Sequence, residues 1–234
     1  MYAWKEGVIL GNPIGHNMGA DATASGIQVL SALACCPIGA RNSNIHPNKD
    51  GVRMDPYTLV TNKMVSYLPK SEMFDGLTYK DIRKLIKPAV MTTFYNSKAE
   101  PIKVFGEDTE ELEVFYEVLH ELFPGAMDII EMVNDRWDSN ALHHKWKLFD
   151  GHVSFCKVVE KVDTIVKVAE LDDAKISYRF YPNQPSDNYN SLMPNMVHSL
   201  DAWIVRALTM LSEELGFDFF AIHDDFEAHP NDQL

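Results

Sequence analysis

The sequence predicts an α+β protein in which a small antiparallel sheet packs on helices. Near the C-terminus, apolar residues from Leu200 to Leu215 recur at helical spacing and stop at Gly216, which is typical of an amphipathic helix with its C-cap. The apolar stretch 217–222 then leads directly into His223-Asp224-Asp225, as expected of a strand that ends in an acidic turn. Residues 153–181 alternate apolar and polar side chains, which predicts two or three more strands.

Composition narrows the class of protein. The 234 residues are 46% hydrophobic, enough for a real core, yet contain no apolar run of the roughly 20 residues that a membrane span needs. The N-terminal residues lack the pattern of a signal peptide, and the three cysteines have neither zinc-site nor disulfide spacing, so we expect a cytoplasmic protein without a membrane partner. The net charge of −13 disfavours nucleic-acid binding by the surface as a whole, although a local basic stripe remains compatible with it.

A capping box marks the most informative helix in the middle of the chain. Thr78 and Asp81 stand at the spacing of the motif, and a helix should follow with Arg83 and Lys87 on one face. Pro88 should kink this helix rather than end it. The other expected elements are a strand and turn over 1–20, a helix over 27–34 ended by Pro37, a loop over 40–55, helices over 56–68, 107–123 and 127–147, and a loop over 182–193.

Three separated patches combine acidic and basic side chains. They are Asp21, the Arg83–Tyr95 segment and the His223-Asp224-Asp225 tip. Taken singly, each has an ordinary explanation: a helix cap, a solvent-exposed basic face and a turn. Taken together, two distant acids with a basic helix between them suit two-metal phosphoryl transfer, because carboxylates hold the cations and the basic side chains neutralise a triphosphate.

In their order along the chain and in their residues, the patches resemble motifs of the single-subunit, phage-type DNA-dependent RNA polymerases, a family that includes the mitochondrial and chloroplast enzymes. Four motifs carry the resemblance. They are Asp21 with Ser25-Gly26-Ile27-Gln28; Arg83, Lys87, Met91, Thr92 and Tyr95, with Asn96 where the family has Gly; His223-Asp224, with Asp225 where it has Ser; and Pro194, Asn195, Val197, His198, Ser199 and Asp201. In addition, Asp55-x-Tyr57 fits a family tyrosine that lies between the first two motifs.

The resemblance implies a role for each matching residue. Asp21, Asp224 and the backbone carbonyl of Ala22 would hold two Mg²⁺ ions, and Lys87 would contact the phosphates and protonate the leaving pyrophosphate. Arg83 would bind the triphosphate, with Tyr57 beside it. Tyr95 and His198 would recognise the 2′-hydroxyl of the incoming nucleotide, and His223 would sit beside the primer 3′ end. For His198, a structural histidine at the start of a helix remains the alternative.

The resemblance also implies an architecture. Residues 1–45 would form the first palm segment, 46–192 a reduced, mostly helical fingers region, and 193–234 the second palm segment with the His-Asp-Asp hairpin. The chain starts almost at the first motif and stops ten residues after Asp224. We therefore expect a second polypeptide to carry the thumb and the promoter-binding N-terminal region, with DNA template, RNA product and NTPs as the other partners, and host cytoplasm as the location if a phage encodes the chain.

Two other functions stay open on the sequence alone. A non-catalytic binding or assembly subunit derived from a palm would account for the short chain and its negative charge. A DNA polymerase or reverse transcriptase would use a similar palm, although Ser25-Gly26-Ile27-Gln28 and the His198 segment argue against it. Asn96 in place of Gly leaves open how closely the backbone packs there.

Overall fold

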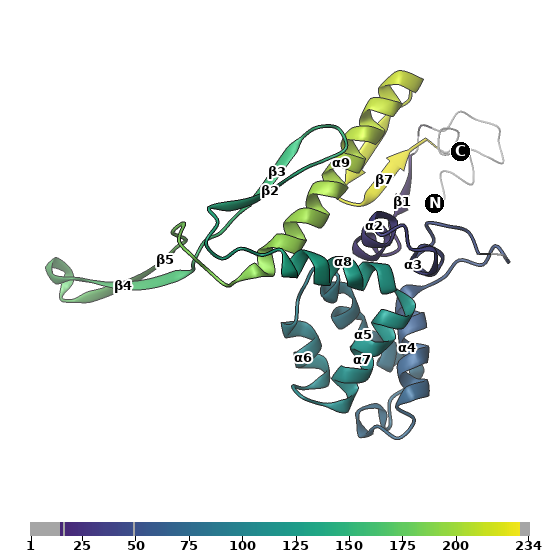
Figure 1. Ribbon diagram of the computed structural model, residues 1–234, viewed down its shortest axis with the longest axis horizontal. Coiled ribbons are helices and arrows are strands. Elements are labelled where there is room, and N and C mark those ends of the chain that lie inside the picture. The colour runs from purple at the N-terminus through teal and green to yellow at the C-terminus, as the bar shows by residue number, and fades with distance from the viewer. Residues whose placement is uncertain (1–14, 16, 49, 230–234) are drawn as a thin grey trace.

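The computed structural model describes residue 15 and residues 17–48 and 50–229 of the chain. Within these residues the protein combines helices with small antiparallel sheets, which confirms the α+β prediction (Figure 1). No helix in this part of the chain is both long and apolar enough to cross a bilayer.

A three-stranded antiparallel sheet joins the two ends of the described chain. Its strands are β1 (Met18–Asp21), β7 (Asp225–Ala228) and β6 (Phe219–Ile222), in the order β1-β7-β6. Asp21 lies directly opposite Asp225 in the ladder. His223 and Asp224 form the turn between β6 and β7, and His223 has a left-handed backbone with φ 59°. The predicted strand with an acidic tip is therefore confirmed.

The helical core lies to one side of this sheet (Figure 1). It consists of α2 (Ser25–Leu33), α3 (Pro37–Asn42), α4 (Pro56–Tyr67), α5 (Tyr79–Thr93), α6 (Ala99–Phe105), α7 (Glu110–Leu122) and α8 (Pro124–Asp135). The largest side chains that are fully buried are Ile27, Leu30, Met64, Ile86, Phe94, Phe115, Leu119, Phe123 and Met193. Burial of apolar area at about 25 cal/mol per Å² makes this core the main source of stability.

The helix that carries the basic residues forms as predicted. Thr78 and Asp81 complete the capping box, since the Thr78 side chain accepts from the Asp81 N–H and the Asp81 side chain accepts from the Thr78 N–H. The helix continues through Pro88 to Thr93 without a break. Arg83, Lys87 and Met91 are consequently placed on successive turns of one rigid element.

The long helix α9 (Leu192–Leu215) joins the core to the sheet. It ends at Gly216, which has the left-handed conformation of a C-cap with φ 76°. Its first half is buried through Leu192, Met193 and Val197, whereas Met210 and Leu215 near its end are 71% and 65% exposed.

Two β-ribbons precede this helix in the chain (Figure 1). The ribbon of β2 (His143–Lys147) and β3 (Val153–Lys157) packs on α9 through β3. The ribbon of β4 (Val162–Val168) and β5 (Ala174–Phe180) projects away from the body. Short 3₁₀ turns occur at Glu72–Phe74, Ala169–Leu171 and Tyr189–Ser191.

Several predicted boundaries are wrong. The helix expected over 127–147 ends at Asp135, and Trp146 lies on β2 instead. The helix expected to end before Pro37 does so, at Leu33, but Pro37 also begins α3, and Pro124 likewise begins α8 directly after α7. A proline in the first turn lacks only an N–H that would be unpaired anyway. The loops expected over 40–55 and 182–193 overlap the ends of α3 and α9, and α6 was not predicted. The predicted strand and turn over 1–20 lie mostly outside the described residues, which include β1.

Candidate active site

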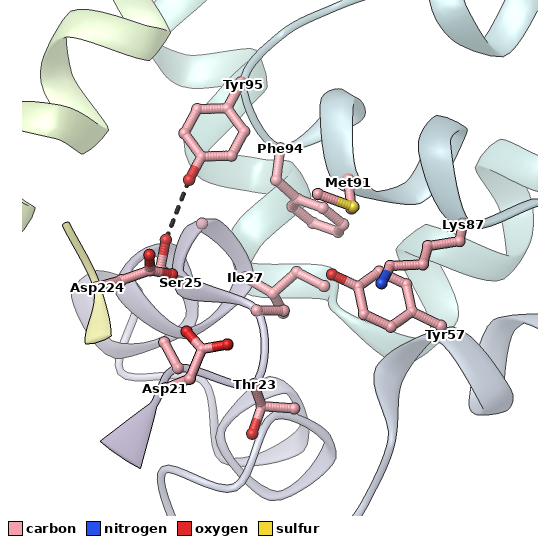
Figure 2. A pocket seen from close by; sticks show the side chains of 13 residues that line it. Asp21, Thr23, Ser25, Ile27, Tyr57, Lys87, Met91, Phe94, Tyr95 and Asp224 are labelled. Atoms are coloured by element: carbon pink, nitrogen blue, oxygen red, sulfur yellow. Dashed lines mark hydrogen bonds between the residues drawn. The ribbon is translucent and has the colours of Figure 1, made fainter. Parts of the chain in front are cut away.

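A cleft of about 280 Å³ brings together residues that are far apart in the sequence. Asp21 and Ala22 enter it from the end of β1, Tyr57 from α4, Lys87 from α5, and Asp224 from the β6–β7 turn. Tyr95, just beyond α5, lines it as well. Figure 2 shows the two carboxylates on one side of the cleft and the Lys87 ammonium beside the Tyr57 ring on the other.

The acidic side of the cleft is fixed by backbone pairing. The ladder between β1 and β7 holds the Asp21 backbone beside the β6–β7 turn, and the Ala22 N–H donates to the Asp224 carbonyl oxygen at 3.2 Å. Two carboxylates and nearby carbonyl groups are the oxygen ligands that Mg²⁺ prefers. The position of Asp21 and Asp224 therefore follows from strand register rather than from side-chain contacts.

Asp225 adds a third carboxyl group to this end of the sheet. Its Oδ1 atom is buried and has no hydrogen-bond partner among the described residues. Its side chain lies against Gly19, where a Cβ atom would stand 2.9 Å from Oδ1. A buried carboxylate oxygen without a donor is unfavourable unless a cation or a proton satisfies it. The residues are thus compatible with bound cations, although no group of three or more His, Cys, Asp or Glu side chains in the described residues is arranged to hold one without other ligands. Mg²⁺ commonly binds through one or two carboxylates and completes its shell with water and phosphate oxygens.

The basic side of the cleft is built around Tyr57. The Lys87 ammonium lies 5.1 Å from the Tyr57 ring centroid, within the range of a cation–π contact. Burial, and then the charge of Asp55, raises the pKa of the Tyr57 hydroxyl, so the phenol stays neutral at pH 7. Lys87 is therefore held over an uncharged ring and makes no salt bridge with a described residue.

Arg83 does not line this cleft. Its Nη2 donates to Asp55 Oδ2 at 2.5 Å, and its Nε lies 3.1 Å from both Asp55 Oδ2 and Thr58 Oγ1. Burial alone would raise the pKa of Asp55, but hydrogen bonds from Thr58 and Arg83, with the charge of Arg83, outweigh burial and lower it. The structure thus places Arg83 one helical turn from Lys87 with its charge already compensated.

Tyr95 stands at the boundary between this cleft and a second hollow. Its hydroxyl is 3.0 Å from Ser25 Oγ (Figure 2), and its ring packs on Gly26, where a Cβ atom would come within 3.2 Å of it. Burial raises the pKa of Tyr95, while the Ser25 hydrogen bond opposes the rise. The motif residues Ser25 and Gly26 therefore position the Tyr95 ring.

The second hollow, of about 650 Å³, contains the two histidines. His198 and His223 line it together with Tyr95 and Asp224. The His198 ring centroid is 5.6 Å from that of Tyr95. His198 lies inside α9 rather than ahead of its helix, because α9 begins six residues earlier, at Leu192. The structure thus brings both candidate ribose-contacting residues to one place.

Asp201 also lines this hollow, although the family resemblance implied no separate role for it. It is on α9, three residues after His198 and on the same face. Burial raises the pKa of the Asp201 carboxyl, the charge of His198 lowers it, and Asp224 raises it. Its position three residues after His198, which places both side chains on one face of a helix, was the sequence signal that could have identified Asp201 as part of the site.

Asn96 occupies a backbone conformation that explains why glycine suits this position. Its φ is 63°, in the left-handed region where asparagine is among the best tolerated side chains after glycine. Its amide is buried and exchanges two hydrogen bonds with Asn134 on α8, at 2.9 and 3.1 Å. Asn96, in place of the family's glycine, therefore keeps the turn and adds a contact to α8.

Comparison with known proteins covers the segments that form this site. The family model described as DNA-dependent RNA polymerase matches residues 16–106 and 157–233, which contain every motif residue above. The mitochondrial DNA-directed RNA polymerase of Schizosaccharomyces pombe is 23% identical over 258 aligned positions, which cover 91% of this chain. The chain spans about a fifth of the length of that relative, 22%. On the extent of the family match, the chain belongs to the phage-type family of DNA-dependent RNA polymerases.

Proposed function

We propose that the chain is the catalytic palm-and-fingers portion of a DNA-dependent RNA polymerase, which transfers nucleotides from NTPs to an RNA 3′ end. The observation that carries the proposal is the single cleft in which Asp21, Asp224, Lys87 and Tyr57 meet from four separate segments. Acids at one end and a cation at the other are the charge pattern that a metal-bound triphosphate requires.

The acidic end is the proposed metal site. Asp21 and Asp224 would hold two Mg²⁺ ions, with the carbonyl oxygen of Ala22 as a further ligand. When bound, two such ions stabilise the attacking and leaving oxygens of an in-line displacement. The buried oxygen of Asp225, which has no donor in the part of the chain that the structure describes, supports a cation near this end of the sheet.

The basic end would bind and activate the triphosphate. Lys87 makes no salt bridge in the described protein, so its ammonium is available to phosphate oxygens and can donate a proton to the leaving pyrophosphate. Arg83, which donates to the Asp55 carboxylate, would release it and bind phosphate oxygens of the triphosphate instead. Carboxylate and phosphate groups both match the planar arrangement of donors on a guanidinium group. The Tyr57 ring, which lies near the cationic groups of both Lys87 and Arg83, would lie beside the triphosphate.

The second hollow would select the sugar and the primer. Tyr95 and His198 line the same hollow with their ring centroids 5.6 Å apart, and a hydroxyl and a ring nitrogen are groups that can hydrogen-bond a 2′-hydroxyl, which a deoxynucleotide lacks. His223 would contact the RNA 3′ end from the turn beside Asp224. The DNA template would pair with the incoming nucleotide, and a second polypeptide would supply the thumb and the promoter-binding region.

Primer extension tests the proposal. The chain, alone and mixed with candidate partner polypeptides, is given an RNA primer on a DNA template, NTPs and Mg²⁺. We expect metal-dependent extension that Asp21→Asn and Asp224→Asn each lower by at least about a hundredfold, a loss comparable to that of removing one electrostatic group from an active site. Asp218→Asn is the matched control, because Asp218 is an exposed acid close to β6 but outside both hollows.

Two results would contradict the proposal. Extension that persists in Asp224→Asn would show that the cleft is not catalytic. Absence of extension with every partner, together with Mn²⁺ binding that is the same in wild type and Asp21→Ala, would favour the non-catalytic assembly subunit instead.

A further inference from the structure

The β2–β3 ribbon has two faces of opposite character. Its inner face is fixed to the body: His144 stacks on Trp137 with ring centroids 4.6 Å apart, and Trp146 Nε1 donates to Ser199 Oγ at 2.9 Å. Cys156 on the same face is buried. Because successive residues of a strand point to opposite sides, the alternate residues must face away from α9.

The outer face is basic and free of acids. The register places His143 opposite Lys157, Lys145 opposite Phe155, and Lys147 opposite Val153, so each of these three rungs carries one lysine. None of the three lysines makes an ion pair with any described residue. In a chain with 34 acidic residues and a net charge of −13, an acid-free strip with three unpaired lysines points to an anionic partner.

An apolar hollow runs along the same face. It has a volume of about 550 Å³ and is lined by Leu142, His143, Lys145, Val153, Phe155, Lys157 and Asn183. Phe155 is 58% exposed and meets the His143 ring edge to face, with centroids 6.3 Å apart. Exposed rings between cations are the features on which single-stranded nucleic acids bind, since bases stack on the rings and phosphates bind the lysines.

We propose that this outer face binds single-stranded DNA. Duplex DNA keeps its bases inside and would use the lysines but leave the apolar hollow empty. RNA gains affinity from polar partners of its 2′-hydroxyl. The lining has no hydroxyl or carboxylate, and the Asn183 amide group already donates to the carbonyl oxygens of Leu142 and Val158, at 2.9 and 2.7 Å. Once phosphates occupy the lysines, the His143 ring nitrogens and the Asn183 amide oxygen are the polar side-chain groups that remain in the lining, so a ribose strand gains little over a deoxyribose strand on this face.

The proposed site is separate from the cleft. It shares no lining residue with the hollows that contain Asp21, Tyr95 and Asp224. Residues 107–156, between the two segments that match the family, include β2 and all of β3 except Lys157. The surface thus lies mostly outside the residues that match the family model.

Fluorescence anisotropy with labelled oligonucleotides tests the proposal, in the absence of divalent cations and NTPs. The probe is an oligothymidine of about ten nucleotides, within the usual site size of a single-strand groove. Lys145→Gln combined with Lys157→Gln should weaken binding at least about tenfold and make the plot of log K against log salt shallower by about 1.4, or 0.7 for each lost phosphate contact. Phe155→Ala should weaken binding about tenfold through lost stacking.

The controls separate this site from general charge and from the cleft. Lys70→Gln combined with Lys103→Gln removes the same charge at two exposed positions elsewhere and should change affinity by less than about twofold. Asp224→Asn, which tests the proposed catalytic function, should leave oligothymidine binding intact. In acetylation footprinting, oligothymidine should protect Lys145 and Lys157 but not Lys103.

Three results would each overturn the proposal. They are undiminished binding by the folded Lys145/Lys157 double variant, equal acetylation of Lys145 and Lys157 with and without DNA, and tighter binding of oligouridine or duplex DNA than of oligothymidine. Circular dichroism and thermal melts establish that the variants are folded.

Discussion

Asn96 and Asn134 exchange two side-chain hydrogen bonds across the gap between the end of α5 and helix α8. This pair fixes the backbone immediately after Tyr95, and its two members come from different parts of the chain: Asn96 lies in a segment that matches the polymerase family, whereas Asn134 lies between the matched segments. Asn96, which stands where the family motif has glycine, therefore also attaches α8 to the end of α5.

Removing one member of this pair should destabilise the protein. Asn134→Ala leaves the buried Asn96 amide without its partner, so we expect a loss of about 1–3 kcal/mol in the free energy of unfolding. Asn96→Ala should cost more than Asn96→Gly, by about 1 kcal/mol, because alanine tolerates a φ of 63° poorly. Urea denaturation measures these differences, with the exposed Asn190→Ala as the control. Equal stability of the Ala and Gly variants would show that the backbone relaxes.

Gly26 should control sugar selection through the Tyr95 ring. In Gly26→Ala the new methyl group would come within 3.2 Å of the ring and displace it from Ser25 and His198. If Tyr95 recognises the ribose, the preference for NTPs over dNTPs should fall by about tenfold, the effect of losing roughly one hydrogen bond. Single-nucleotide incorporation assays measure this ratio. Gly15→Ala is the control, since no atom of the described residues lies within 4 Å of the Cβ position there. An unchanged ratio would separate Tyr95 from sugar selection.

Alkaline pH should weaken the fold through its buried tyrosines. Burial raises the pKa of Tyr57, Tyr95 and Tyr116 above the ordinary value of 10.0. For a raised pKa the stabilisation is fully present below the unfolded value and is lost as pH rises through the folded value, so stability should decline above about pH 10. Denaturation at a series of pH values measures the slope, and Tyr95→Phe should reduce it. Spectroscopic titration of Ser25→Ala should show a higher Tyr95 pKa, because the hydrogen bond that opposes the rise is gone.

Asp55 has two roles that substitution can separate. Its Oδ1 caps α4 by accepting from the Tyr57 N–H at 3.0 Å, while Oδ2 pairs with Arg83. Asp55→Ala should cost about 1 kcal/mol for the cap and up to about 1 kcal/mol for the partly exposed ion pair, whereas Asp55→Asn should lose only the second. The lowered pKa of Asp55 means that its contribution is present above pH 3.8 and disappears as pH falls through the folded value. Acid denaturation curves should therefore become shallower in Asp55→Asn; identical curves would argue that the pair contributes nothing.

The sequence predicted those parts of the fold whose signals are local. The capping box at Thr78, Pro56 in the first turn of α4, and Gly216 after α9 each mark an end that the structure confirms. Helix α6 has no side-chain cap at Lys98 and is short, so it offered no such signal. The extension of α9 back to Leu192 depends on packing of Met193 in the core, which periodicity further along the helix does not reveal.

The candidate site divides in the same way. The motifs identified Asp21, Tyr57, Lys87, Tyr95 and Asp224, and the structure places all five in one cleft. Their roles in catalysis remain proposals. The pairing of Arg83 with Asp55, the reciprocal amides of Asn96 and Asn134, and the outward face of the β2–β3 ribbon depend on contacts between distant segments, and a single sequence does not specify such contacts.

The separation between core and sheet has a consequence for how the protein opens. Among the described residues, the main apolar core includes none from β1, β6 or β7, and the sheet contacts the long helix α9 through β6. Amide hydrogens in the first half of α9 should therefore exchange with solvent only when the whole domain unfolds, whereas those of the three strands should exchange through a cheaper local opening. Asp21 and Asp224 would then separate from Lys87 while the helices stay folded. The cleft is therefore the boundary between a part of the protein that opens locally and a part that opens only on global unfolding.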